Sequence, residues 1–165
     1  MTARVTELLG TIDERRFREL RRDYVDVAWF DARKSRQRVV SEGRIELELC
    51  LPAGAFISDG AVLWAGQDSV LVARREPARA CRISFSASAD PLTALREAAI
   101  LGHALGNQHV PIEFDGEELL APVLTSDAVM TETIERLGLA TVEVHFGEER
   151  LFAHEPATKF AAANG

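Results

Sequence analysis

The alternation of polar and apolar positions changes character near the middle of the chain. In the first half, apolar residues recur at every second position in short runs, and residues 44–49 (RIELEL) give the clearest example. A period of two is typical of half-buried strands. Turn-forming residues separate the runs, for example at 58–60 and 66–68. Closely spaced strands with such turns between them predict a small all-β unit.

The strands expected in this unit alternate with short polar segments. A charged helix or loop is expected at residues 13–22, and Val39 and Val40 supply the apolar positions of residues 36–41. Charge and proline interrupt the pattern at residues 74–78, where we place the end of the unit. Strands are predicted at residues 4–9, 26–30, 44–49, 62–65 and 69–73, with a short strand or bend at 55–57.

A long helix is predicted in the second half. Asp90 can cap its N-terminus, and Pro91 can occupy its first position because the missing N–H has no partner there anyway. The spacing of apolar residues predicts that the helix spans residues 91–105. The apolar face expected from this spacing consists of Leu92, Leu95, Ala99, Gly102 and Leu105.

A second helix and four strands complete this half. Ser126 or Asp127 can cap the second helix, which ends at Gly138. Its expected apolar face contains Val129, Met130, Thr133, Ile134 and Leu137. Strands are predicted at residues 79–86, 110–114, 118–123 and 140–146. The resulting order is βαββαβ, which is that of ferredoxin-like domains with two helices on one face of an antiparallel sheet.

The fold class is therefore predicted as α+β with two domains and a tail. Residues 1–76 are expected to form the N-terminal β domain, and residues 77–150 the ferredoxin-like domain. No periodicity survives after residue 147, so residues 151–165 are expected to be a flexible C-terminal tail.

Composition and charge narrow the function classes. The 165 residues carry a net charge of −7, which disfavours a broad nucleic-acid-binding surface. No apolar run approaches the roughly 18 residues of a membrane span, and no signal-peptide pattern is present at the N-terminus. A cytoplasmic protein that binds neither nucleic acid nor membrane is expected.

The sequence contains few residues that point to catalysis. A phosphate-binding glycine loop, a GxSxG elbow and an HExxH helix are all absent. Cys50 and Cys81 lack a CxxC spacing and are expected to be small buried residues. The chemistry that remains belongs to four histidines: His103, His109, His145 and His154. Imidazole is a common ligand of nickel, zinc and copper, so these residues are candidate metal ligands.

His109 is the strongest of the four candidates. Gly106 and Asn107 readily adopt the left-handed conformation that ends helices, and Pro111 prevents the helix from resuming. His109 is therefore expected on a short, stiff connection. One histidine is too few for a tight metal site, but a residue near a two-fold axis meets its own copy in a dimer.

Several segments of the chain resemble one known family. Residues 105–111 (LGNQHVP) resemble the Gly-Asn-Arg-His-Val/Leu-Pro signature of the UreE family, which are nickel metallochaperones and urease accessory proteins. Residues 31–39 (DARKSRQRV) resemble the family's Asp-x-Arg-x-Lys-Ser-Arg-x-Arg segment, with one residue missing or shifted. Residues 51–54 and 58–63 resemble its Leu-Pro-Arg-Gly and Asp-Gly-Asp-Leu-Leu turns. The resemblance covers nearly the whole chain.

The resemblance implies a function and partners. The N-terminal β domain would contact partner proteins, and the C-terminal ferredoxin-like domain would dimerise and bind metal. His109 would lie at the homodimer interface and, with its symmetry mate, hold nickel for delivery to the urease apoprotein. A GTPase accessory protein is the other implied partner. No reaction is catalysed in this role, so no catalytic residue is predicted.

The chain departs from the family pattern where additional ligands are expected. Ala104 stands where many relatives have a second histidine, and residues 126–128 (SDA) stand where some have His-Asp-His. The histidine-rich tail of several members is also absent. The central site is therefore expected from two copies of His109, with His154 and His145 as further ligands. Nickel is the expected cargo, and zinc or copper can use the same imidazoles in vitro.

Two other classes of function compete with the nickel carrier. In the first, the chain is a metal-independent adaptor whose β domain binds a protein partner through a basic strip formed by Arg33, Lys34, Arg36 and Arg38. In the second, it is a ferredoxin-like binder of RNA or single-stranded DNA. The acidic net charge and the lack of paired exposed aromatic residues on a strand disfavour the second class.

Overall fold

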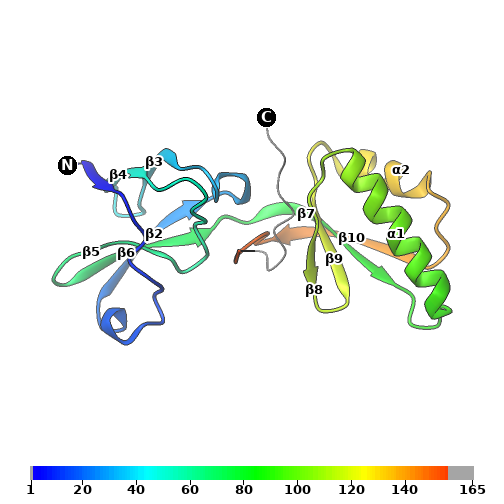
Figure 1. Cartoon of the computed structure of the whole chain (residues 1–165), viewed down its shortest axis with the longest axis horizontal. Coiled ribbons are helices and arrows are strands. Elements are labelled where there is room, and N and C mark those ends of the chain that lie inside the picture. Colours follow the sequence, from blue (N-terminus) through cyan, green and yellow to red (C-terminus); the bar gives the residue numbers. More distant parts are fainter. Residues whose placement is uncertain (1, 156–165) are drawn as a thin grey trace. The chain divides into compact units, whose positions relative to one another are not determined.

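The computed structural model of the chain describes residues 2–155, and its elements are labelled in Figure 1. The chain divides into two compact units. Unit 1 comprises Met1–Glu76 and Phe152–Gly165, and unit 2 comprises Pro77–Leu151. The chain therefore leaves unit 1 after Glu76 and returns to it at Phe152. No helix within residues 2–155 combines the length and the apolar character needed to cross a membrane.

Unit 1 contains two three-stranded sheets of similar construction. In the first sheet, β4 lies between β1 and β3, parallel to β1 and antiparallel to β3. In the second, β6 lies between β2 and β5, parallel to β2 and antiparallel to β5. The strands are β1 (Thr2–Val5), β2 (Arg21–Val27), β3 (Arg36–Val40), β4 (Glu46–Cys50), β5 (Val62–Ala65) and β6 (Ser69–Arg75).

The core of unit 1 combines side chains from both sheets. Val25 and Val27 of β2 belong to the same buried cluster as Leu47 and Leu49 of β4. The alternation predicted at residues 44–49 is confirmed from Glu46 onward, because Leu47 and Leu49 are fully buried while Glu46 is exposed. Ile45 does not follow it, since it lies before β4 and is 38% exposed. A smaller cluster centred on Phe17 packs with Val62, Val70 and Val72 of the second sheet.

Three segments of unit 1 differ from the prediction. The strand predicted at residues 4–9 ends at Val5, because β1 spans Thr2–Val5. β2 begins at Arg21, within the segment expected to be a charged helix or loop. Its first two residues are exposed arginines, so the start of this edge strand carries no hydrophobic signal. The predicted strand at residues 26–30 ends at Val27, and Trp29–Asp31 forms a short 3₁₀ helix, η2. A second 3₁₀ helix, η1, spans Arg15–Phe17.

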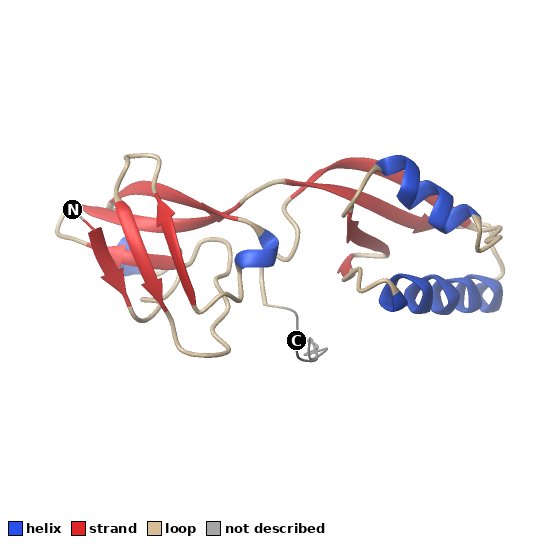
Figure 2. Ribbon diagram, turned by 90° about the horizontal axis from the view of Figure 1, so that it is seen from above, coloured by secondary structure: helices blue, strands red, loops and turns tan. Residues whose placement is uncertain are grey.

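Unit 2 has the predicted βαββαβ order. Its sheet has the strand order β10-β7-β9-β8 with every neighbouring pair antiparallel. One buried cluster joins both helices to the same face of this sheet. Figure 2 shows the helices and strands of the unit. The elements are β7 (Ala78–Phe85), α1 (Pro91–Asn107), β8 (Glu113–Asp115), β9 (Glu118–Pro122), α2 (Asp127–Glu135) and β10 (Val142–Glu149).

The caps of the helices follow the sequence closely. The Asp90 side chain accepts a hydrogen bond from the Thr93 N–H at 3.0 Å, and Pro91 is the first residue of α1. Ser126 caps α2 by accepting from the Val129 N–H at 3.3 Å. These caps satisfy backbone donors that have no partner within the helix.

The apolar face predicted for α1 is wrong in part. Leu92 and Leu95 are 52% and 66% exposed, whereas Glu97, Leu101 and Leu105 are buried. The buried residues recur every four positions and lie on the opposite side of the helix from Leu92 and Leu95. Both sides are rich in apolar residues, so periodicity alone did not distinguish the side that faces the sheet. On α2, Met130 and Ile134 are buried as expected, but Val129 is 48% exposed.

The beginning of the predicted flexible tail is packed. β10 continues to Glu149, and Leu151 and Phe152 are buried. The Phe152 ring lies 5.7 Å from the Trp29 ring, and the Asp59 N–H donates to the Ala153 carbonyl at 2.6 Å. The rest of the predicted tail, residues 156–165, lies outside the described residues.

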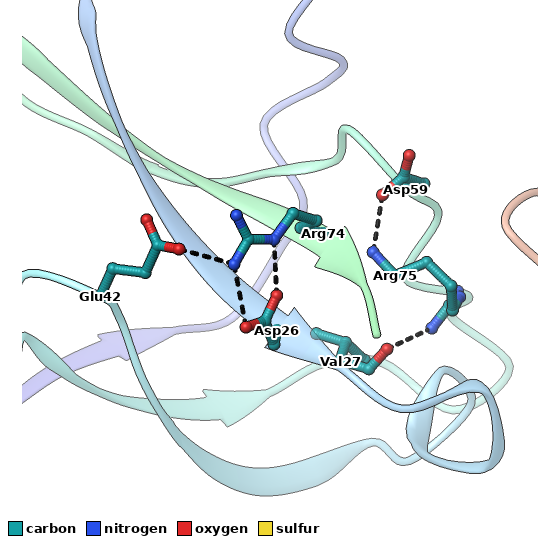
Figure 3. A network of polar contacts seen from close by, with 6 residues as sticks. All are labelled: Asp26, Val27, Glu42, Asp59, Arg74 and Arg75. Carbon is teal, nitrogen blue, oxygen red and sulfur yellow. Dashed lines mark hydrogen bonds and ion pairs between the residues drawn. The ribbon is translucent and has the colours of Figure 1, made fainter. Parts of the chain in front are cut away.

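Arg75 explains why this segment is held in unit 1. Its buried guanidinium donates to the carbonyls of Val27 at 3.0 Å, Ala28 at 3.2 Å, Ile57 at 2.7 Å and Phe152 at 3.2 Å. A buried cation without such acceptors would be costly. Figure 3 shows Arg75 beside Val27 and Asp59, whose carboxylate accepts from the Arg75 backbone N–H at 2.6 Å.

Candidate metal site

The C-terminus of α1 has a well-defined hydrogen-bonding pattern. The Val110 N–H donates to the Leu105 carbonyl at 3.0 Å, and the His109 N–H donates to the Gly106 carbonyl at 3.0 Å. Together with Gln108 as the C-cap, these two bonds form a Schellman motif. Leu105 and Val110 are both buried in the cluster beneath the helix, which is the hydrophobic contact that accompanies this motif.

His109 occupies the left-handed position of the motif. Its φ is 57°, and its side chain is exposed. Glycine is the usual residue at this position because a Cβ makes the left-handed conformation costly. The sequence predicts this conformation at Gly106 and Asn107, but both lie within the helix. The left-handed turn is thus made by the candidate ligand itself.

His103 lies on the exposed side of α1. Its Nε2 is 3.0 Å from the Nδ2 of Asn107, one helical turn further on. By helical spacing, His103 shares a side with Leu95 and Ala99, each four residues from the next. It is therefore on the exposed apolar side of the helix, not in the core.

His145 lies on the face of the sheet opposite the helices. Its neighbours Val144 and Phe146 pack in the helix-side cluster, and side chains alternate along a strand. His145 is exposed and pairs in register with Arg82 of β7. The Arg82 guanidinium is hydrogen-bonded to Glu118 at 2.6 Å and to Glu149 at 2.9 Å, so the surroundings of His145 are highly charged.

His154 belongs to unit 1. It is exposed between Ala153, whose carbonyl accepts from Asp59, and Glu155, whose carboxylate lies 3.5 Å from the Arg33 guanidinium. Its two neighbours are therefore held by contacts within unit 1, while His154 itself is exposed. The three candidate ligands lie in different settings: a helix end, the far face of a sheet and a segment of the other unit.

Within residues 2–155, no group of three or more histidine, cysteine or carboxylate side chains is placed to hold a metal ion. Cys81 is unsuited to such a role, because burial raises the pKa of its thiol to about 12 and metals bind the thiolate. A single chain therefore offers His109 as one accessible imidazole donor at the end of α1.

An exposed apolar surface leads along α1 towards His109. Leu92, Leu95 and Ala99 recur at helical spacing on the solvent side of the helix. Gly106 follows on the same side, and a Cβ built there would meet nothing within 4 Å. We call Leu92, Leu95, Ala99 and Gly106 the α1 outer face. Its last residue lies three positions before His109.

The predicted basic strip separates into two parts. Arg33 pairs with Glu155 and lies 5.0 Å from the Phe56 ring, and Lys34 pairs with Asp31. Arg36 and Arg38, in contrast, are exposed on β3. The register places a further arginine near them. Glu48 of β4 pairs with Arg38 of β3 on one side and with Arg4 of β1 on the other. Sequence reasoning missed Arg4 because only the pairing of β1 with β4 brings it there.

Two family models match the chain. The model described as "UreE urease accessory protein, N-terminal domain" matches residues 5–75, and that described as "UreE urease accessory protein, C-terminal domain" matches residues 86–157. Both candidate ligands of unit 2, His109 and His145, fall within the second match. His154 does so as well.

Individual relatives agree with these matches. A protein named "Urease accessory protein UreE" from Corynebacterium efficiens is 34% identical over 140 residues, which is 82% of this chain and 85% of the relative. A protein of the same name from Acetivibrio thermocellus is 27% identical over 136 residues, or 82% of each chain. One from Burkholderia lata is 33% identical over 115 residues, covering 69% of this chain and 51% of the relative.

The two β sheets of unit 1, the βαββαβ unit and these matches define an accessory protein of an enzyme. The chain belongs to the UreE family of urease accessory proteins. Its role therefore lies in urease maturation, and the family resemblance inferred from residues 31–39, 51–54, 58–63 and 105–111 is confirmed.

Proposed function

We propose that this chain carries nickel at a homodimer interface and delivers it to the urease apoprotein while the urease active site is assembled. The observation that carries the proposal is the position of His109. Its ring is exposed at the end of α1, and its backbone adopts a conformation that glycine would adopt more easily. Backbone strain of this kind is concentrated at functional sites, where a particular side chain is needed.

A homodimer supplies what one chain lacks. One imidazole gives a weak metal site, because even catalytic zinc sites take three protein ligands. A two-fold axis close to His109 would double the number of imidazoles. The α1 outer face supports such an axis, since Leu92 and Leu95 leave apolar surface exposed on the helix that ends just before His109.

The fold of unit 2 supports this arrangement. We propose that unit 2 is a ferredoxin-like dimerisation and metal-binding domain. The strand order β10-β7-β9-β8 is that expected for a split βαβ arrangement. It leaves α1 with one side on the sheet and the other on the surface.

The chemistry of imidazole suits a carrier. Nickel accepts imidazole nitrogen, and zinc and copper compete for the same ligands. A site with few ligands holds the metal loosely enough to pass it on. Protons compete with metal for the imidazole lone pair, so nickel binding should weaken as the solution becomes acidic. In this proposal His145 and His154 remain additional ligands, and the urease apoprotein and a GTPase accessory protein remain the partners, in the cytoplasm.

The proposal is tested by replacing His109 with alanine. Equilibrium dialysis should show that His109→Ala loses the tightest nickel-binding event per dimer, because both copies of the central ligand disappear together. His145, an exposed histidine on the face of the sheet away from the helices, is only an additional ligand, so His145→Ala should retain the tightest event and lose at most a weaker one. Unchanged nickel stoichiometry and affinity in His109→Ala would refute the central site.

A further inference from the structure

We propose that β3 and the arginines around Glu48 form a docking site for an extended acidic segment of a partner protein. The site deepens the proposed function, since delivery requires that a partner be recognised. It occupies unit 1 and does not involve His109. We call it the β3 arginine site and define it by Arg4, Arg36, Arg38 and Glu48.

The sheet register places these side chains on one surface. Leu47 and Leu49 of β4 point into the core, so Glu48 between them points to the other face of the sheet. Arg38 of β3 and Arg4 of β1 are the register partners of Glu48, one on each side. Arg36 is the partner of Cys50, two residues further along β4 and on the same face.

This surface is concave and carries a local positive charge. A hollow of about 290 Å³ is lined by Arg4, Arg36, Arg38, Glu48 and their neighbours on β3 and β4. Three guanidinium groups surround one carboxylate there, in a chain whose net charge is −7. In the described part of the chain, the side chains of Arg4, Arg36 and Arg38 form no hydrogen bond, ion pair or ring contact. Their charge is therefore available to a ligand.

The hollow is too small for a large cofactor but suits side chains. Ligand pockets are typically about 300–1,000 Å³, so this one lies at the lower limit. Guanidinium groups recognise carboxylates and phosphates equally well by geometry. The choice between these ligands must therefore come from the surroundings of the arginines.

The free edge of β3 favours a peptide. β3 is an outer strand of the sheet β1-β4-β3, and among the described residues no backbone hydrogen bond joins residues 36–40 to a strand other than β4. β2 approaches the end of this edge, where the Glu42 N–H donates to the Tyr24 carbonyl at 2.8 Å, so the open part of the edge lies towards Arg36. An unpaired strand edge is a template for another extended chain. A phosphate or a nucleotide would leave these donors and acceptors unused, whereas a peptide backbone complements them.

The spacing of the arginines matches such a peptide. Arg36 and Arg38 are two residues apart on one strand, so they are separated by roughly 7 Å along it. Acidic residues at alternate positions of a segment paired with β3 would repeat at the same distance and lie directly opposite them. Arg4 offsets the charge of Glu48, which would otherwise repel the segment.

The test measures binding of a defined acidic peptide to the full-length protein. The probe is a fluorescent peptide with glutamate and valine at alternate positions, and the control peptide has glutamine in place of glutamate. Fluorescence anisotropy at low salt should show that Arg36→Ala/Arg38→Ala binds the acidic peptide roughly tenfold more weakly than the unmodified protein, because each exposed charge pair contributes up to about fivefold. The matched control is Arg21→Ala/Arg22→Ala, two exposed arginines on the edge strand of the other sheet. It should leave the affinity unchanged.

Two further measurements separate docking from a structural role. Glu48→Gln should bind the acidic peptide more tightly, by about two- to fivefold, because a repelling charge is removed. Amide hydrogen exchange at residues 36–40 should slow when the peptide is bound, because strand pairing protects the edge.

Three results would overturn the proposal: equal affinity of Arg36→Ala/Arg38→Ala and the unmodified protein, unchanged exchange at residues 36–40, or displacement of the peptide by equimolar inorganic phosphate or single-stranded oligonucleotide. Nickel binding by Arg36→Ala/Arg38→Ala should equal that of the unmodified protein. Failure of the docking site and failure of the nickel site are therefore distinguishable.

Discussion

At the residue scale, His109 combines an exposed ring with a backbone conformation that favours glycine. The φ of 57° places it at the left-handed position of the Schellman motif that ends α1. The left-handed conformation costs a residue with a Cβ roughly 1–2 kcal/mol. If the ring is needed for metal, stability and function are opposed at this single position.

Replacing His109 by glycine and by alanine separates the two effects. Both variants lack the imidazole, so both should lose the tightest nickel-binding event. Urea unfolding should show that His109→Gly is more stable than His109→Ala by about 1 kcal/mol, because only glycine relieves the positive φ. Gln108, in contrast, has a φ of −93°. Gln108→Gly should therefore be less stable than Gln108→Ala, because glycine there only increases the conformational freedom of the unfolded chain. Equal stabilities of the two His109 variants would contradict the strained geometry.

Glu97 is a second residue whose charge is set by its contacts. It is buried on α1 and accepts hydrogen bonds from the backbone N–H groups of Ala140 at 2.8 Å and Thr141 at 2.9 Å, as well as from the Thr141 hydroxyl. The hydroxyl and the two N–H groups lower the pKa of Glu97 below its usual value of 4.5. The ionised Glu97 carboxylate therefore connects α1 by hydrogen bonds to the two residues that precede β10.

The contribution of Glu97 should depend on pH. Because the pKa of Glu97 is lower in the folded chain than in the unfolded chain, its ionised carboxylate stabilises the fold. This contribution is complete above the pKa of the unfolded chain, near 4.5, and is lost as the pH falls through the pKa of the folded chain. Glu97→Gln should therefore unfold at a lower temperature than the unmodified protein at pH 7, and this difference should shrink on acidification below pH 4.5. The exposed Glu117→Gln is the control and should match the unmodified protein throughout. A difference that is independent of pH would contradict this account.

At the scale of elements, α1 serves two surfaces at once. Glu97, Leu101 and Leu105 face the sheet, while Leu92 and Leu95 on the α1 outer face remain exposed. An apolar helix side that remains exposed is a candidate contact for a second apolar surface. In the proposed homodimer, that partner is α1 of the other copy.

Leu95→Glu tests this arrangement. Leu95 is 66% exposed, so the substitution should hardly change the stability of the single chain. In a two-fold interface the two glutamates would face each other and repel, and sedimentation velocity should show a shift from dimer to monomer. Val40→Glu, at a position 56% exposed in unit 1, should leave the dimer intact. A Leu95→Glu protein that sediments as the unmodified dimer would place the interface elsewhere.

Much of this architecture could be predicted from local pattern. Strand β5 and the starts of β6, β9 and α1 agree with the sequence because turns, caps and alternation specify them locally. The side of α1 that faces the sheet could not be predicted, because both sides are apolar. β2 could not be placed either, since exposed arginines at its start hide an edge strand. Nor could Arg4 be assigned to the β3 arginine site, because pairing between strands far apart in sequence brings it there.

At the scale of the whole molecule, unit 1 is built from two separate parts of the chain. Residues up to Glu76 form its two sheets, and residues 152–155 return to this unit. Phe152 is only 8% exposed, and its carbonyl accepts from the buried Arg75 guanidinium at 3.2 Å. The stability of unit 1 should therefore depend on a residue that follows all of unit 2 in sequence.

Phe152→Ala provides the test. Removing a buried phenylalanine ring costs about 3–5 kcal/mol, which should appear in the unfolding of unit 1. Both tryptophans of the chain, Trp29 and Trp64, lie in unit 1, so tryptophan fluorescence reports on this unit alone. Its transition should move to a lower urea concentration. Phe114→Ala in unit 2, where the ring is 74% exposed, should leave the midpoint of this fluorescence transition unchanged. An unchanged transition in Phe152→Ala would show that unit 1 is complete without the returning segment.

The return of the chain at Phe152 also fixes an order of events during synthesis. A ribosome delivers the strands of unit 1 first, but the side chain that closes against Trp29 and the carbonyl that Arg75 binds emerge only after Leu151. Domains generally fold as units in the order in which they are made. Here the order is reversed, because all residues of the inserted unit 2 are synthesised before the last residues of unit 1. Unit 2 can therefore complete its fold before unit 1 has formed its last contacts.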